Sequence, residues 1–293
     1  MGLSFTIDTP VKVARYGISS VISIIEDELI EKMREHYCKE MALEYHPIKT
    51  SEDDFRAKRI TAYLNLIDTI VNDQIEHLKK LPFIAGSDIV KYFELLDDES
   101  PIKKIYEEMK AMKDDWYKDF LQEQLRSTIV AGSIDVNLMA KVDKVNYTKS
   151  GEPLPHEYSD ALSAFRGFAN STLRSSIVLS AGYNPFLYAY VEQFKDFYPD
   201  ANGALKKKII LKVSDFRSAL TQGKLFAKKG LWVSEFRIES GLNCGGHAFA
   251  TDGLLLGPIL EEFKEKKNAL GDELLSLYNT ALEAKGQDRK SVV

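Results

Sequence analysis

Residues 208–238 read KIILKVSDFRSALTQGKLFAKKGLWVSEFRI, and this stretch decides the fold class. It opens with a short apolar run rich in Ile, Leu and Val, which predicts a buried strand. Ser214 and Asp215 are helix-capping residue types, so they predict the start of a helix that ends near Gly230. A second β-rich run follows at 231–238. Two short strands joined by one helix are typical of a β-α-β unit with parallel strands.

The same alternation extends in both directions along the chain. At the amino end, VKVARYGISSVISII at 11–25 predicts a first buried strand leading into a loop, and acidic residues at 26–28 open a helix that runs to about residue 45. Further elements are expected at 128–131 and 134–142 (one or two strands), 159–173 (helix), 176–180 (strand), 186–197 (helix) and 258–285 (helix). Ser159 is a helix-capping residue type at the start of the 159–173 helix. The pattern predicts an α/β fold, a TIM-barrel-like (β/α) parallel sheet with about five β-α units.

The segment between the first two strands has a different pattern. Within residues 51–126, apolar positions recur at helical spacing and no strand-like run interrupts them. We interpret this segment as a helical insertion whose apolar residues cover the barrel or cap a site. Residues 1–50 then form the first β-α unit, and residues 127–293 continue the same barrel. A complete barrel needs more units than these, so we expect either an open sheet or the N-terminal portion of a longer barrel.

The composition is that of an ordinary globular protein. Of 293 residues, 44% are hydrophobic and 28% are charged, and the net charge of -5 gives no electrostatic signature of a nucleic-acid partner. Cys38 and Cys244 lie in unlike contexts and do not indicate a disulfide framework. The sequence has neither a signal-peptide pattern nor an apolar run of the roughly 18 residues that a spanning helix needs. We therefore expect a cytoplasmic protein without a membrane partner.

Functional groups in α/β folds gather in the loops that follow the carboxyl ends of the strands. The richest such loop is SGLNCGGHAFAT at 240–251, where glycines allow the backbone to approach a ligand and His247 supplies an imidazole. Further candidates are the strand-end segments 16–19, 137–141, 180–182 and 214–215. Cys244 is interpreted as a small residue that packs under a ligand. A single Cys and His without further ligands does not predict a metal site.

The stretch from Ile209 to His247 resembles the nitronate monooxygenase (2-nitropropane dioxygenase) group of FMN-dependent TIM-barrel proteins, which is related to flavin-type enoyl reductases. In that group a strand and a helix lead into a strand that ends in Glu-Ala-Gly-Gly-His, and here the motif reads Asn-Cys-Gly-Gly-His at 243–247. The segment DVNLMAKV at 135–142 is similar to the family's Gly-Val-Asn-Leu strand, and VKVARYGISS occupies the place of its first FMN-contacting strand.

This resemblance implies an FMN-dependent oxidoreductase that acts on a small molecule at a carbon acidified by a neighbouring group. His247 would lie near the reactive edge of the flavin as a base or a substrate-orienting group. Self-association into a homo-oligomer is left open. The residues implied to bind the cofactor are Gly17, Ile18, Asn137, Lys141, Ser180, Gly245 and Gly246.

The chain departs from the family pattern, and two other functions are open. Asn243 and Cys244 replace Glu and Ala, and the family's phosphate-binding loops come from later strands. If the chain is a truncated product, its affinity for FMN should be poor. One alternative is a TIM-barrel lyase or aldolase, for which Lys141 or Lys212 would form a Schiff base. The other is a degenerate, non-catalytic barrel that serves as an interaction scaffold.

Overall fold

The computed structural model describes residues 6–24, 26–113, 115–139, 143–148, 150–180, 184–239 and 256–286. The chain folds as two compact units. The first contains Met1–Ile22 and Asn65–Asp135, and the second contains Ser23–Leu64 and Val136–Val293. The division passes through three elements, Ser20–Ile24 (β1), Phe55–Leu78 (α3) and Ile134–Leu138 (β2).

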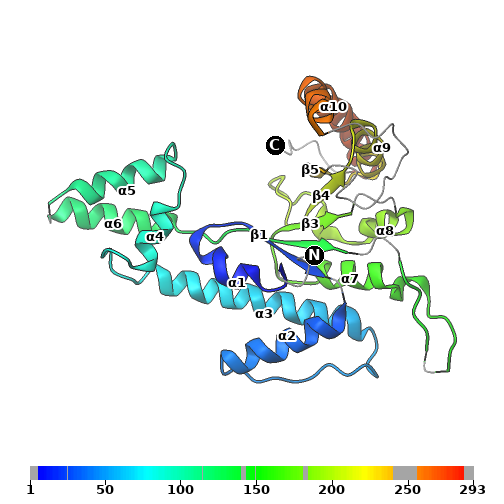
Figure 1. Cartoon of the computed structure of the whole chain (residues 1–293). Helices are drawn as coiled ribbons and strands as arrows, with labels where there is room; N and C mark the ends of the chain where they lie inside the picture. Colours follow the sequence, from blue (N-terminus) through cyan, green and yellow to red (C-terminus); the bar gives the residue numbers. More distant parts are fainter. Residues whose placement is uncertain are drawn as a thin grey trace. The chain divides into compact units, whose positions relative to one another are not determined.

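A five-stranded sheet runs in the order β1-β2-β3-β4-β5 (Figure 1). The pairs β2–β3, β3–β4 and β4–β5 are parallel. For β1, Ser20 N–H donates to the Ser133 carbonyl and Met139 N–H to the Ile24 carbonyl, so β1 and β2 also run in the same direction. This confirms the predicted α/β fold. The strands are Ser20–Ile24 (β1), Ile134–Leu138 (β2), Ser176–Leu179 (β3), Lys208–Val213 (β4) and Val233–Ile238 (β5).

Helices follow the strands in β-α units. Predicted caps are confirmed at two of them, because the Ser159 side chain accepts from Leu162 N–H and Asp215 accepts from Ser218 N–H. None of the described helices is both long and apolar enough to cross a membrane. The helices of these units are Asp27–Glu40 (α2), Phe55–Leu78 (α3), Asp160–Ala169 (α7), Pro185–Tyr190 (α8), Phe216–Ala227 (α9) and Leu256–Ala284 (α10), with 3-10 turns at Val191–Gln193 (η4) and Lys195–Phe197 (η5).

The two largest differences in helix length from the prediction concern α2 and α8. The first was expected to run to about residue 45, but α2 ends at Glu40, and Ala42 then has a φ of 53°. The helix expected over 186–197 ends at Tyr190 and continues as the short turns η4 and η5. Helical periodicity does not distinguish an α-helix from short 3-10 turns, because both present a similar spacing of apolar residues.

The sheet has two faces of different chemistry. Parallel register places Asn137 beside Val178 and Val178 beside Ile210, so these side chains share one face. The next row on that face includes Lys212 and Arg237, which are also partners. We call this the polar face. The opposite face is built from buried aliphatic residues, namely Ile22, Ile24, Val136, Leu138, Ile177, Leu179, Ile209, Leu211 and Val213, and we call it the apolar face.

Helices α9 and α10 pack on the apolar face of β5. A Cβ placed on Gly223 of α9 would lie 2.8 Å from Leu274 of α10 and 3.2 Å from the ring of Phe236. Phe236 pairs with Leu211 in the sheet, so it points to the apolar face. Figure 1 shows both helices alongside β4 and β5. The sequential strand order is compatible with the winding of a β/α barrel, whereas doubly wound sheets reverse their strand order.

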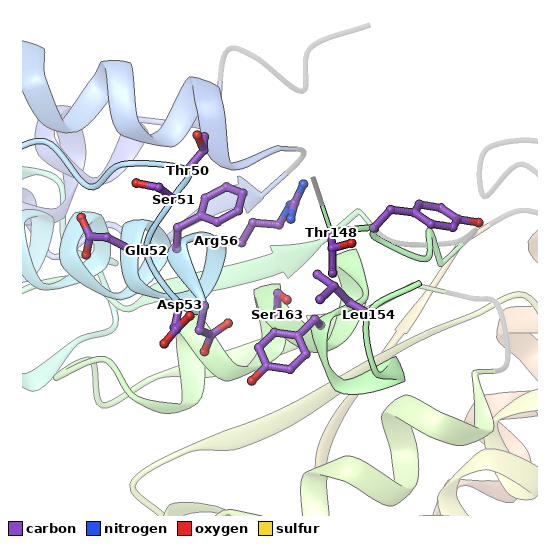
Figure 2. A pocket seen from close by; sticks show the side chains of 12 residues that line it. Thr50, Ser51, Glu52, Asp53, Arg56, Thr148, Leu154 and Ser163 are labelled. Atoms are coloured by element: carbon purple, nitrogen blue, oxygen red, sulfur yellow. The ribbon is translucent and has the colours of Figure 1, made fainter. Parts of the chain in front are cut away.

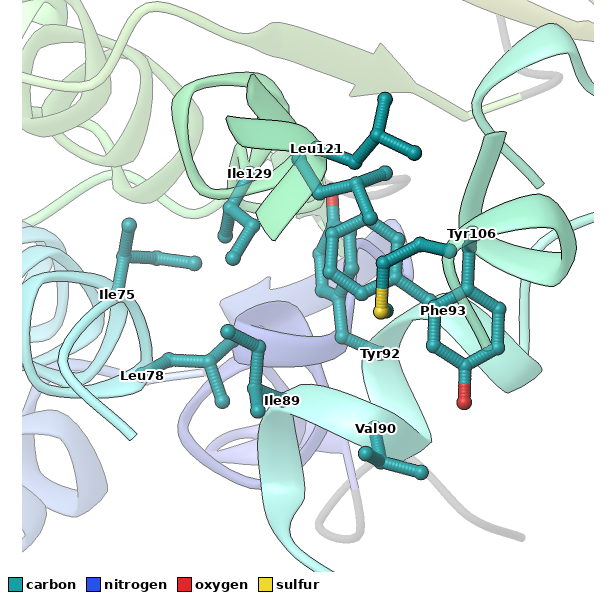
Figure 3. Packing of buried hydrophobic residues seen from close by; sticks show 11 residues of the cluster. Ile75, Leu78, Ile89, Val90, Tyr92, Phe93, Tyr106, Leu121 and Ile129 are labelled. Carbon is teal, nitrogen blue, oxygen red and sulfur yellow. The ribbon is translucent and has the colours of Figure 1, made fainter. Parts of the chain in front are cut away.

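The first unit contains the helical segment. Besides the part of α3 from Asn65 onward, the helices of this unit are Thr9–Val13 (α1), Asp88–Glu94 (α4), Pro101–Ala111 (α5) and Trp116–Thr128 (α6), with a 3-10 turn at Ala14–Tyr16 (η2). Between α3 and β2 the described residues form helices and loops, as the helical spacing predicts. Their core holds stacked aromatic rings, since the centroids of Phe93 and Tyr106 lie 5.4 Å apart (Figure 3). Burial, together with the nearby acids Glu94 and Glu107, raises the pKa of Tyr106 to about 12.

The prediction of a strand beginning at Val11 is wrong. Pro10 at the start of α1 favours a helix, and Gly17 ends the following 3-10 turn with a φ of 76°. The strand is β1, which begins only at Ser20. Gly17 and Ile18 therefore precede the first strand instead of following it, at the amino edge of the sheet, and the positional reason for assigning them to the cofactor is lost. The strand considered at 128–131 is also absent, because Thr128 ends α6.

Gly132 gives a test of the packing at the amino edge. A Cβ at Gly132 would lie 2.1 Å from the Ile18 carbonyl oxygen and 2.2 Å from its carbon, and both are backbone atoms. We expect Gly132→Ala to lower the free energy of unfolding by about 3 kcal/mol, the upper end of overpacking costs, measured by urea denaturation. The matched control is Gly271→Ala in α10, where no atom lies within 4 Å of the new Cβ. This change should stabilise the protein by roughly 0.5–1 kcal/mol, and equal effects of both changes would contradict the packing.

Candidate functional site

The carboxyl edge of the sheet carries polar side chains on its polar face. Asn137 of β2 donates from Nδ2 to Ser23 Oγ of β1 at 3.4 Å and to Met139 Sδ at 2.9 Å. Its Oδ1 is buried and has no hydrogen-bond partner among the described residues. A buried amide oxygen without a partner is costly, by about 1–3 kcal/mol. Asn137 is therefore the residue of this edge that most clearly calls for a ligand.

The neighbouring strands continue this polar edge. Ser180, directly after β3, donates from Oγ to the Leu138 carbonyl at 3.0 Å. At the end of β4, Lys212 Nζ pairs with Glu239 Oε1 at 3.1 Å, and Glu239 N–H donates to the Val213 carbonyl. An amide, a hydroxyl, an ammonium and a carboxylate group thus follow one another from β2 to β5.

The predicted site residues divide into three groups. Asn137 and Ser180 lie at the carboxyl edge, as expected. Gly17 and Ile18 lie before β1. Lys141, Gly245, Gly246 and His247 lie outside the described residues, but the 240–251 loop follows Glu239, whose backbone is bonded to the carboxyl end of β4.

A cleft of about 620 Å³ opens at the carboxyl ends of β1 and β2, and we call it the edge cleft. Its volume lies within the usual range for small-molecule sites, about 300–1,000 Å³. Met139 belongs to it, so the side chain that contacts Asn137 also faces the cleft. The cleft is lined by Ile24, Glu26, Asp27, Glu28, Arg56, Ile60, Met139, Lys144, Asp160 and Ala164.

Arg56, the second residue of α3, is the central cation of the edge cleft. Its Nε lies 3.3 Å from Asp27 Oδ1 and 3.6 Å from Asp160 Oδ1. Its guanidinium carbon lies 4.6 Å from the centre of the Phe55 ring. Two carboxylates and one aromatic face therefore fix the orientation of this side chain.

A second cavity of about 650 Å³ lies beside α3 and also has Arg56 in its wall (Figure 2). Figure 2 shows Thr50, Ser51 and Glu52 on one side and Thr148 and Leu154 on the other.

The wall of this second cavity is tied to α7. Asp54, which precedes α3 with a φ of 53°, accepts hydrogen bonds from Arg166 Nε at 2.6 Å and from its Nη2. Burial alone would lower the pKa of Arg166, but hydrogen bonds to Asp54 and Tyr190 outweigh it and raise the pKa.

The segment between α2 and α3 is held by a buried network. Glu31 accepts hydrogen bonds from Arg34 Nη2 at 2.7 Å and Nε at 3.0 Å, and from the Tyr45 hydroxyl and the Ile48 N–H, each at 2.9 Å. Arg59 binds the Ile48 carbonyl with two nitrogens and Asp27 with the third. This network fixes the carboxylate of Asp27, and through it Arg56.

Sequence reasoning missed Ser23, the partner of Asn137, and the residues of the edge cleft. Ser23 carries a readable signal, because it is a polar residue between Ile22 and Ile24 in a buried strand. Arg56 and Lys144 carry none, since each lies in an unremarkable charged segment. Their place in the cleft depends on contacts between α2, α3 and α7, which no local pattern encodes.

Comparison with known proteins gives no relative for this chain. No family model matches it, no curated protein matches it, and no solved structure is similar to it. The assignment of function therefore depends on the geometry and on the sequence motifs.

The Glu31 network makes the stability of the protein depend on pH. Burial would raise the pKa of Glu31, but the hydrogen bonds from Arg34, Ile48 and Tyr45 together hold it below its ordinary value of 4.5. A lowered folded-state pKa gives stabilisation that is present above the unfolded pKa and is lost as pH falls through the folded one. We expect Glu31→Gln to cost about 3 kcal/mol at pH 7 and progressively less below pH ~4.5, measured by urea denaturation at several pH values.

The matched control for this pH dependence is Glu44→Gln, because Glu44 is exposed and contacts only the exposed His46 side chain among the described residues. A cost of Glu31→Gln that stays constant from pH 7 to pH 3 would contradict the role of the ionised carboxylate.

Proposed function

We propose that this protein is an FMN-dependent oxidoreductase that acts on a small molecule at a carbon acidified by a neighbouring group. The flavin ring would lie at the carboxyl edge of the sheet, between Asn137 and the 240–251 loop. The observation that carries the proposal is the buried Oδ1 of Asn137, which has no partner among the described residues. The Gly-Gly-His motif, which resembles that of nitronate monooxygenases, adds independent support from the sequence.

The groups at this edge fit a flavin ring. The pyrimidine edge of the ring includes an N–H group, and the Asn137 carboxamide offers an acceptor for it, because its amide nitrogen already donates to Ser23 and Met139. Asn137 Oδ1 would accept the ring N–H, and Ser180 would contribute a hydroxyl one strand further along. The aliphatic side chains of Val178 and Ile210, which follow Asn137 across the polar face, would offer apolar contact to the ring.

The chemistry divides between the cofactor and the chain. When bound, the flavin supplies an acceptor for two electrons. His247 would take the proton from the acidified carbon of the substrate, because neutral imidazole is a base near neutral pH. Gly245 and Gly246 would allow the loop to lie close to the ring, since they have no side chain.

One rival function is disfavoured by a contact at the same edge. A lyase or aldolase of the Schiff-base type needs a free amine at a strand end. Lys212, one of its two candidate residues, is held in an ion pair with Glu239 at 3.1 Å. The other candidate, Lys141, lies outside the described residues.

The first test of the proposal is binding of FMN. We expect the protein to bind FMN and Asn137→Ala to weaken the binding about tenfold, the equivalent of one buried hydrogen bond, measured by quenching of flavin fluorescence. The control is Asn170→Ala, at the exposed carboxyl end of α7. If the purified protein is colourless, does not bind FMN and is not stabilised against heat by FMN, the proposed flavin cofactor is rejected. The non-catalytic interaction scaffold is then the remaining alternative.

The second test separates catalysis from binding. We expect His247→Ala to keep its affinity for FMN but to slow reduction of the bound flavin by neutral 2-nitropropane roughly a hundredfold or more, because the acceptor for the proton on its acidified carbon is lost. The reaction is followed by bleaching of the flavin's visible absorption without oxygen. His46→Ala, with its exposed side chain, is the control. Unchanged turnover in His247→Ala would remove this histidine from the reaction.

A further inference from the structure

We propose that the edge cleft binds the anionic group of a small organic molecule, a carboxylate or a phosphate, through the guanidinium of Arg56 with help from Lys144. This site goes beyond the proposed flavin chemistry and does not depend on it. Its components all belong to described residues of one compact unit.

The orientation of Arg56 leaves its hydrogen-bonding fork open. Asp27 and Asp160 both approach Nε, at 3.3 and 3.6 Å. Neither terminal nitrogen, Nη1 or Nη2, forms a hydrogen bond with a described residue, although Arg56 lines both cavities. A guanidinium held in this way presents two parallel N–H groups, the geometry that binds carboxylate and phosphate oxygens in pairs.

Two of the four carboxylates that line the edge cleft have a cationic partner other than Arg56. Asp27 is bound by Arg59 at 2.7 Å. Glu28 pairs with Lys32 at 2.9 Å, and the hydrogen bond from Lys32 lowers the pKa of Glu28.

The two remaining carboxylates differ from each other. Asp160 accepts from Asn146 Nδ2 at 2.9 Å. Glu26 forms no hydrogen bond or ion pair with a described residue, and its side chain is exposed to water, which screens its charge.

Lys144 supplies the second cation. It lines the edge cleft, is exposed, and forms no ion pair with any described residue. Its backbone is fixed, because the Lys144 carbonyl accepts from Asp160 N–H at 3.2 Å. A flexible ammonium beside a fixed guanidinium allows anions of different shape to bind, so both carboxylate and phosphate are suitable ligands.

The test uses two probes, inorganic phosphate and succinate, titrated by calorimetry into the whole chain without flavin at constant ionic strength. We expect at least one anion to bind, and Arg56→Lys to weaken that binding about tenfold. Lysine keeps the charge and can still reach Asp27, but it lacks the fork. The control is Lys58→Gln, two residues along α3, because Lys58 approaches Glu52 at 3.7 Å and does not line the edge cleft.

Each outcome decides the proposal. Preference for phosphate or for succinate identifies the ligand's anionic group, and loss of binding in Arg56→Lys with an unchanged urea midpoint supports the site. Absence of binding by both anions, or equal binding by Arg56→Lys, would overturn it. If Arg56→Lys is destabilised, Lys144→Gln is the second test in the same assay. It should weaken anion binding several-fold and leaves the ion pairs of Arg56 with Asp27 and Asp160 intact, so unchanged binding in this variant would also overturn the proposal. Flavin binding is measured separately, so its failure leaves this result intact.

Discussion

The single direction of the strands is the constraint on which the rest of the molecule depends. Parallel neighbours require a crossover between every pair of strands, and the crossovers here are helices. Where the contacts are clearest, at α9 and α10, the helices cover the apolar face and bury its aliphatic side chains. Polar groups are then tolerated on the other face, and the carboxyl ends of all strands meet at one edge. Asn137, Ser180 and Lys212 lie together for this reason, although they are far apart in the sequence.

The edge cleft is shaped by buried charges more than by apolar packing. Moving Glu31, Arg34 and Arg59 out of water carries a large desolvation cost, and apolar residues of similar size would often be as stable. Apolar residues could not satisfy the backbone groups of Ile48, whose N–H and carbonyl are bound by Glu31 and Arg59. The network thus replaces secondary structure for a segment that has none, and it fixes one wall of the cleft.

Most of the sheet could be predicted from the sequence because its signals are local. Strands β3 and β4 are short apolar runs between helix caps, and Ser159 and Asp215 cap their helices as expected. The prediction of a strand from residue 11 was wrong because the β-branched residues of 11–25 suggested a strand, whereas Asp8-Thr9-Pro10 indicates the start of a helix. Giving Pro10 more weight would have placed Gly17 before the strand. Of the predicted site residues, Asn137 and Ser180 lie at the expected carboxyl edge, because one is on a strand and the other directly follows one.

The two open groups of this edge differ in what they demand of a ligand. Asn137 Oδ1 is buried and has no hydrogen-bond partner among the described residues, so a ligand or a residue outside the described ranges is left to satisfy it. Arg56 is 28% exposed, so water can hydrate its fork in the absence of an anion. The amide is therefore the stronger argument that something binds, whereas the guanidinium decides the charge of what binds. Met139 touches the amide and also faces the cleft, so one molecule with an N–H edge and an anionic group, or two molecules side by side, would satisfy both.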